Sequence, residues 1–280
     1  MIDPVFLRQL DQFKLAMKKK TSSIYKGSEQ SRETGRGLTF KDFREYSPGD
    51  DIRYIDWKVY AREEKFYIKT FEEERDMTIH IILDASQSMD FGDPLKYEYA
   101  AKLGLGVVYL ACKNNQKFEF SIFSDKFEAL ESTQAILRII DRLNSKKPKG
   151  QTNIGDTLAD YNKKIKSKSL IIIISDFLFD IQNLETVLLN LKRNDIMLIQ
   201  VLDEKERQLA YSGDSILKDS ETQALLHTYI SQRLKSKYAD ELQTHIKRIE
   251  NTCRKLNIGF LTTTNNVPFF ESFFEVFKML

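Results

Sequence analysis

The chain of 280 residues is long enough for one large domain, or for one domain with a sizeable appendage. It is 41% hydrophobic and 30% charged, which is ordinary for a soluble protein with a substantial core, and its net charge of +2 gives no electrostatic case for nucleic-acid binding. The longest apolar runs are far too short to cross a bilayer, and the first residues lack the pattern of a signal peptide. We therefore expect a cytoplasmic protein without a transmembrane segment.

Taken in chain order, residues 3–20 have the apolar spacing of a helix that ends in three lysines, which suit a helix C-terminus. The segment 35–62 has no clear period and is dense in Gly, Arg, Asp and aromatic residues. Its alternating arginines and aspartates indicate either an ion-pair network that locks the segment on the rest of the protein or a surface that docks a partner. The candidate docking residues are Arg44, Tyr46, Asp50, Asp51, Arg53, Asp56 and Trp57.

The stretch from Thr78 to Ser88 is a continuous apolar run that ends in one acid and two hydroxyls. Such a run predicts a strand buried on both faces, at the centre of a parallel sheet. Ligands of open α/β sheets bind just beyond the carboxyl ends of the strands, where Asp84, Ser86 and Ser88 stand. Oxygen side chains at alternate positions of one loop can converge on a hard cation such as Mg²⁺.

A second apolar run, residues 169–175, is followed directly by Asp176, and a polar loop that carries Thr152 lies between the two runs. Further strands are expected at 118–125 and 195–203. Helices are expected at 97–112, 133–143, 153–165 and 181–192. The alternation of strands and helices predicts βαβ units and an α/β fold with a parallel sheet.

The C-terminal part is expected to contain a hairpin within 215–229, a long helix over 231–256 opened by a serine cap, and a closing strand at 258–262. An aromatic-rich helix over 268–280 is expected to pack in the core. We predict an N-terminal region of residues 1–75 and an α/β domain of residues 76–280.

One acid, two serines, a threonine and a second acid, in this order on three loops, resemble the metal-ion-dependent adhesion site of the von Willebrand factor A fold. The resemblance implies a Rossmann-like parallel sheet flanked by helices. It also implies hydroxyl ligands from Ser86, Ser88 and Thr152, and waters of the same ion held by Asp84 and Asp176. The ion would be Mg²⁺, or else Mn²⁺ or Ca²⁺, and an Asp or Glu of a protein partner would complete its coordination.

The pattern Arg-x-Tyr-x-x-Gly-Asp-Asp-x-Arg-x-Ile-Asp-Trp, which runs from Arg44 to Trp57, resembles the bacterial family called domain of unknown function 58. Members of that family resemble von Willebrand factor A domains and are typically encoded beside MoxR-type AAA+ ATPases. The resemblance implies a family-specific N-terminal segment packed on the A-type domain. It also implies an adaptor or chaperone-like protein that works with such an ATPase, rather than an enzyme.

Three other interpretations compete with a metal-dependent module. A metal-dependent phosphohydrolase of the haloacid-dehalogenase type needs an acid two residues after its nucleophile, and Ser86 occupies that position. Asp84 and its two serines could instead cap the helix that follows. Nucleic-acid binding would rest on two short lysine patches, 18–20 and 146–149, which have no aromatic stacking platform.

Overall fold

In the computed structural model, the described residues are 2–3, 5–24, 38–47, 49–73, 77–124, 127–131, 136–151 and 154–280. The chain divides into two compact units, one of residues 1–20 and 77–280 and one of residues 21–76. The predicted N-terminal region comprises residues 1–75, but in the structure the first twenty of these residues belong to the larger unit. Ile2, Phe6 and Leu10 bury their side chains in the core of the larger unit, and this explains the difference.

The larger unit is built on a six-stranded sheet in the order β10-β7-β6-β3-β4-β5. Its strands are β3 (Thr78–Asp84), β4 (Phe118–Phe123), β5 (Phe127–Glu131), β6 (Ser169–Ser175), β7 (Asp195–Leu202) and β10 (Gly259–Thr264). All neighbours pair in parallel except β5, which is antiparallel to β4 at one edge. The predicted α/β fold with a central parallel sheet is therefore confirmed.

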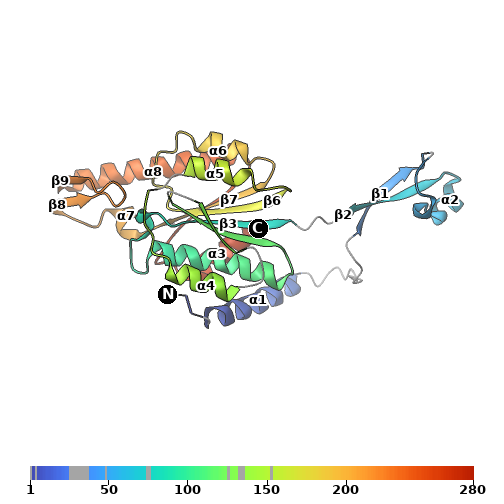
Figure 1. Cartoon of the computed structure of the whole chain (residues 1–280), viewed down its shortest axis with the longest axis horizontal. Coiled ribbons are helices and arrows are strands. Elements are labelled where there is room, and N and C mark those ends of the chain that lie inside the picture. The colour runs from blue at the N-terminus through green and yellow to red at the C-terminus, as the bar shows by residue number, and fades with distance from the viewer. Residues whose placement is uncertain are drawn as a thin grey trace. The chain divides into compact units, whose positions relative to one another are not determined.

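Helices cover both faces of this sheet, as Figure 1 shows. One face carries α1 (Val5–Ile24), α3 (Lys96–Lys113), α4 (Ile136–Ser145) and α9 (Phe269–Met279), and the other carries α5 (Ile154–Asn162), α6 (Leu184–Asn190) and α8 (Gln232–Lys255). The strands β3 and β6 are buried almost throughout, because both of their faces meet helices. Ser231 caps α8 as predicted, its hydroxyl accepting from the Leu234 amide.

Two short elements follow β7: the helix α7 (Glu204–Gln208) and a hairpin of β8 (Gly213–Lys218) and β9 (Leu225–Ile230). The hairpin forms a two-stranded sheet of its own and was expected from the sequence, whereas α7 was not. The helix begins with a capping box. The Asp203 carboxylate accepts from the Lys205 amide, and the Glu206 carboxylate accepts from the Asp203 amide.

The smaller unit consists of an antiparallel pair, β1 (Leu38–Glu45) and β2 (Tyr67–Glu73), and the elements between them. These are a 3₁₀ turn (Ile52–Tyr54) and the helix α2 (Trp57–Glu63). Asp56 caps α2 by accepting hydrogen bonds from the amides of Lys58 and Val59. The segment in which the sequence showed no clear period is thus ordered by local turns and caps.

Candidate functional site

The candidate site lies at the carboxyl edge of the sheet, between β3 and β6. These strands are parallel neighbours with Leu83 opposite Ile174, so Asp84 and Asp176 reach the same edge. The chain continues from β3 to β4 on one side, and β6 lies on the other side. This reversal of strand order is the topological switch point at which α/β sheets bind ligands.

Asp84 is completely buried and holds the site together. Its Oδ1 accepts a hydrogen bond from the Ser86 amide at 2.8 Å, and its Oδ2 accepts one from the Ser175 hydroxyl at 2.6 Å. Burial, followed by the nearby charge of Asp176, raises the pKa of Asp84 to about 7, although the hydrogen bonds from Ser175 and Ser86 act in the opposite direction. A cation at this site would favour the ionised form of Asp84.

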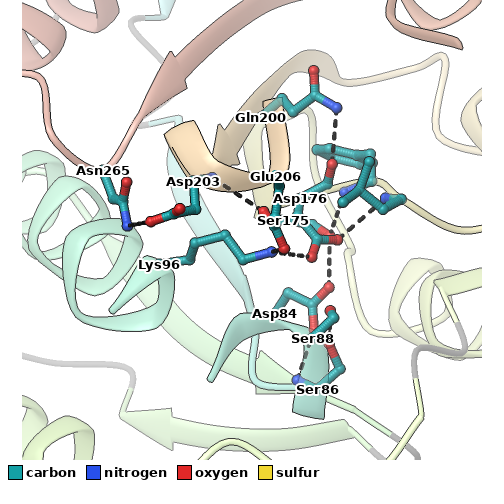
Figure 2. Close-up of polar contacts among 12 residues, drawn as sticks. Asp84, Ser86, Ser88, Lys96, Ser175, Asp176, Gln200, Asp203, Glu206 and Asn265 are labelled. Atoms are coloured by element: carbon teal, nitrogen blue, oxygen red, sulfur yellow. Dashed lines mark hydrogen bonds and ion pairs between the residues drawn. The ribbon is translucent and has the colours of Figure 1, made fainter. Parts of the chain in front are cut away.

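The hydroxyls of Ser86 and Ser88 point toward one another, with 3.0 Å between their Oγ atoms. Ser86 is fully buried and Ser88 is half-buried, and Figure 2 shows both beside Asp84. The loop after β3 therefore gathers two neutral oxygens next to one carboxylate.

Thr152 lies outside the described residues, but the loop that leads to it is fixed against the site. The Lys149 amide donates to the Ala85 carbonyl at 2.9 Å, and the Gln87 amide donates to the Gly150 carbonyl at 3.0 Å. The backbone two residues before Thr152 is therefore tied to the loop that carries Ser86. The place of Thr152 among the ligands stays a prediction.

Lys96 is a site residue that the sequence analysis missed. Its side chain is completely buried, and its Nζ lies 2.8 Å from Asp176 Oδ2 and 2.7 Å from Glu206 Oε1. Burial disfavours the charged form of Lys96, but the charges and hydrogen bonds of Asp176 and Glu206 outweigh it, so the pKa of Lys96 is raised. The site thus contains a permanent positive charge of its own.

The side chains of Gln200, Asp203 and Asn265 lie beside this centre (Figure 2). Gln200 of β7 donates from Nε2 to the Asp176 carbonyl at 2.8 Å, and Asn265 donates from Nδ2 to Asp203 Oδ2 at 2.7 Å. Gly92 packs against the last pair with a φ of +96°, and a Cβ there would collide with the side chains of Asp203 and Asn265. The site loop, α7 and the loop after β10 are therefore held in one network.

A cavity of about 260 Å³ adjoins the site, and Ser88, Asp176 and Glu206 form part of its wall. Its lining joins the site to the tip of the hairpin: Ser88, Asp176, Leu178, Phe179, Glu206 and residues 219–222. Asp219 shapes that tip, because its Oδ1 accepts from the amides of Glu221 and Thr222. The cavity leaves room for an approaching group beside Ser88 and Asp176.

The residues of this edge fit a hard divalent cation, because all the candidate ligands are oxygens and two of them are convergent hydroxyls. Across the described part of the chain, no group of three or more His, Cys, Asp or Glu side chains is arranged to hold a metal. The candidate site is of another kind, in which Ser86, Ser88 and Thr152 would hold the ion directly. Asp84 and Asp176 would hold its waters.

In the smaller unit, the candidate docking residues mostly pair with one another. Arg44 contacts Asp50 at 2.8 Å and Arg53 contacts Asp51 at 2.6 Å, with the arginine side chains 51% and 83% exposed. Both pairs lie at the surface of this unit. The hydrogen bond and charge of each arginine lower the pKa of the paired aspartate.

Three aromatic residues of this unit, Trp57, Tyr60 and Phe66, form a cluster at its surface. Tyr60 and Phe66 stack with their ring centres 4.4 Å apart, and Trp57 meets both rings edge-on while remaining 62% exposed. Tyr46 contacts Phe66 at 6.3 Å. Of the residues predicted to dock a partner, Trp57 therefore offers the largest apolar surface.

The sequence profile of the family described as "Protein of unknown function DUF58" matches residues 42–248. The chain belongs to this family. The match runs from the segment before α2 through both loops of the site to α8, so the family spans the two compact units.

Among the curated relatives of this DUF58 protein is "Uncharacterized protein Rv1480" of Mycobacterium tuberculosis, 23% identical over 261 residues, which cover 90% of this chain and 82% of the relative. Among solved structures, BatB of Bacteroides thetaiotaomicron is 15% identical and covers 72% of this chain and 98% of its own, with a TM-score of 0.45. The ArnB paralog VWA2 of Sulfolobus acidocaldarius is 17% identical and covers 48% of this chain and 37% of its own, with a TM-score of 0.33.

Among the described residues, no helix combines the length and the apolar character needed to cross a bilayer.

Proposed function

We propose that this DUF58 protein is a metal-ion-dependent protein-binding module and not an enzyme. The observation that supports the proposal best is the meeting of Asp84, Asp176 and the paired serine hydroxyls under a cavity, at the switch point of the sheet. Mg²⁺ is the ion we favour, with Mn²⁺ and Ca²⁺ as alternatives of the same ligand preference.

An ion held mainly by neutral hydroxyls and waters would keep much of its charge and attract a carboxylate. Ser86 and Ser88 orient their oxygens through the hydrogen bond between them, and Asp84 is oriented by Ser175. Lys96 forms ion pairs with both Asp176 and Glu206, so its positive charge offsets one of their two negative charges. The partner would therefore present an Asp or Glu side chain through the cavity that Ser88 lines.

The partner itself is proposed from the family resemblance, which implies a MoxR-type AAA+ ATPase. In that case the module would act as an adaptor or chaperone-like component of the ATPase. A cytoplasmic location is part of the same proposal, and the two free thiols Cys112 and Cys253 suit a reducing compartment.

The test is a pull-down from native lysate with the tagged protein, in buffer with Mg²⁺ and in buffer with EDTA. We compare the wild type with Asp84→Asn and with Asp195→Asn, which changes an exposed aspartate at the opposite end of a strand. Retention of a partner that needs both Mg²⁺ and Asp84, but not Asp195, supports the module. Retention that is indifferent to the ion and to Asp84 contradicts it.

A direct measurement of ion binding accompanies the pull-down. Calorimetric titration with Mg²⁺ should show binding to the wild type and to Asp195→Asn, and at least about tenfold weaker binding to Asp84→Asn. A loss of this size corresponds to about 1.4 kcal/mol. Equal heats for all three proteins would mean that the ion does not bind at Asp84.

A further inference from the structure

The hairpin of β8 and β9 carries several large apolar side chains that are exposed to solvent. Figure 1 shows it at one end of the sheet unit, beyond α7 and α8. Its exposed apolar side chains are Ile216 at 60%, Leu225 at 62%, Leu226 at 60% and Tyr229 at 65%. Ile216, Leu225 and Tyr229 lie on one face of the ribbon, because residues paired across two strands share a face, and Leu226 lies on the other face. A two-stranded hairpin with exposed apolar side chains is by itself only marginally stable.

One edge of β8 is open. β9 pairs with the other edge over all six residues, from Gly213 opposite Ile230 to Lys218 opposite Leu225. Within the described residues, the sheet of β8 and β9 has no third strand. An open edge presents unpaired N–H and C=O groups, which form a template for another strand.

The charges along β8 show which strand fits this edge. Asp214, Ile216 and Lys218 point to the same face because side chains alternate along a strand, and all three are exposed. Neither Asp214 nor Lys218 forms an ion pair with another described residue. The strand therefore carries an acid and a base placed symmetrically, two residues on either side of an apolar residue.

A second copy of β8 is complementary to this pattern. If two β8 strands run antiparallel with Ile216 opposite Ile216, then Asp214 of each copy lies opposite Lys218 of the other. Side chains directly opposite in an antiparallel pair have their Cβ atoms about 5 Å apart, close enough for attraction between opposite charges and for contact between the two isoleucines. Charges usually protect an edge from pairing, but here they favour one antiparallel register.

We propose that the chain forms a symmetric homodimer by antiparallel pairing of β8 with β8 of a second copy. The result is a four-stranded intermolecular sheet in the order β9-β8-β8-β9, with a twofold axis at Ile216. The interface is isologous, so it closes with two copies and does not propagate. It goes beyond the proposed metal-dependent function, because no residue of the metal site takes part in it.

The pairing would also bear on the cavity. Lys218, the last residue of β8, directly precedes the turn 219–222 that lines the cavity above Ser88 and Asp176. Fixing β8 against a second copy would fix the position of that turn. The turns that line the two cavities of the dimer would then be joined through one four-stranded sheet.

The test is sedimentation equilibrium over a wide range of concentrations, with four proteins. The wild type should dimerise, and Asp214→Lys and Lys218→Asp should each weaken the dimer by at least about tenfold, because each places like charges opposite one another at both ends of the pair. Lys192→Asp, which reverses an exposed charge on another part of the sheet unit, should dimerise as the wild type does. Circular dichroism checks that each variant is folded.

The decisive measurement is an equimolar mixture of Asp214→Lys with Lys218→Asp. In the mixed pair, two lysines of one copy face two aspartates of the other, so a heterodimer should form at concentrations at which each variant alone is mainly monomeric. The doubly exchanged variant, Asp214→Lys with Lys218→Asp in one chain, should dimerise with itself. A wild type that stays monomeric, a dimer indifferent to the single reversals, or a mixture that fails to associate would each overturn the proposal.

Discussion

The ammonium nitrogen of Lys96 lies 2.8 Å from Oδ2 of Asp176, and the two side chains are 0% and 2% exposed. One of the two acids predicted to hold the waters of a metal ion is therefore already paired with a cation of the protein. The same ammonium group contacts Glu206 on α7, so it also ties the loop after β6 to the helix that precedes the hairpin. A buried charge of this kind is stable only while its partners remain in place.

Replacement of Lys96 by Met should destabilise the sheet unit by about 3 kcal/mol, because it leaves Asp176 and Glu206 without their buried counter-charge. Lys113→Met is the control, since Lys113 lies on the same helix and forms an exposed pair with Asp11 at 3.4 Å. We expect little or no loss for the control, because an exposed ion pair contributes little to stability. Urea unfolding in EDTA measures both, and equal losses would contradict a structural role for the buried pair.

The stability of the metal-free protein should depend on pH through Asp84, whose pKa rises from 3.8 to about 7 on folding. The folded state holds this proton more tightly than the unfolded state does, so the contribution is complete below about pH 4 and is lost as the pH rises through 7. The free energy of unfolding should fall over this window, by about 1.4 kcal/mol per pH unit at most.

The measurement is denaturant unfolding in EDTA from pH 4 to pH 8, for the wild type and for Asp84→Asn. The asparagine cannot titrate, so the variant should show a flatter dependence on pH. Added Mg²⁺ should raise the stability of the wild type most at the upper end of the range, where Asp84 is ionised. Parallel pH profiles for the two proteins would show that Asp84 does not titrate in this window.

Gly92 should not tolerate a side chain. Alanine there would be strained at a φ of +96°, and its Cβ would also meet Asp203 and Asn265, whereas a Cβ on Gly213, with a φ of +82°, meets no atom within 4 Å. Gly213→Ala therefore reports the backbone strain alone, about 1–3 kcal/mol. We expect Gly92→Ala to cost more than this in thermal unfolding of dilute protein, and an equal cost would show that the loop relaxes freely.

Substitutions of Asp56 and Trp57 distinguish a structural role of the Arg- and Asp-rich segment from a role in docking a partner. Asp56→Ala removes the cap of α2 and should cost the smaller unit about 1 kcal/mol. Trp57→Ala removes an exposed ring and should leave the unfolding transition nearly unchanged, while reducing retention of the partner in the pull-down. A partner retained equally by Trp57→Ala and the wild type would exclude docking through the aromatic cluster.

The sequence predicted the sheet well because its central strands are continuous apolar runs, which only a doubly covered parallel sheet can bury. The positions of Asp84 and Asp176 followed from the same reasoning, since both directly end such runs. The pairing of β1 with β2 was not predicted. Its register shifts between Phe40 and Asp42, and the shift interrupts the alternation by which a strand is recognised.

Lys96 could not be assigned to the site from the sequence, because lysine at the start of a helix is usually exposed. One signal was available. Lys96 lies four residues before Ala100 and seven before Leu103, so it shares the stripe of α3 that is buried against the sheet. Its role also depends on Glu206, more than a hundred residues away, and α7 is too short to show a period.

The first and last helices of the chain pack against each other. Phe6 meets Phe269 with ring centres 4.8 Å apart, and Phe13 meets Phe270 and Phe273 at 5.5 and 5.3 Å. During synthesis, α1 emerges from the ribosome more than 200 residues before these rings exist. The part of its apolar face that meets α9 must then stay exposed, or be shielded by a chaperone, until α9 has been translated. Completion of this core is therefore a late event in the biogenesis of the protein.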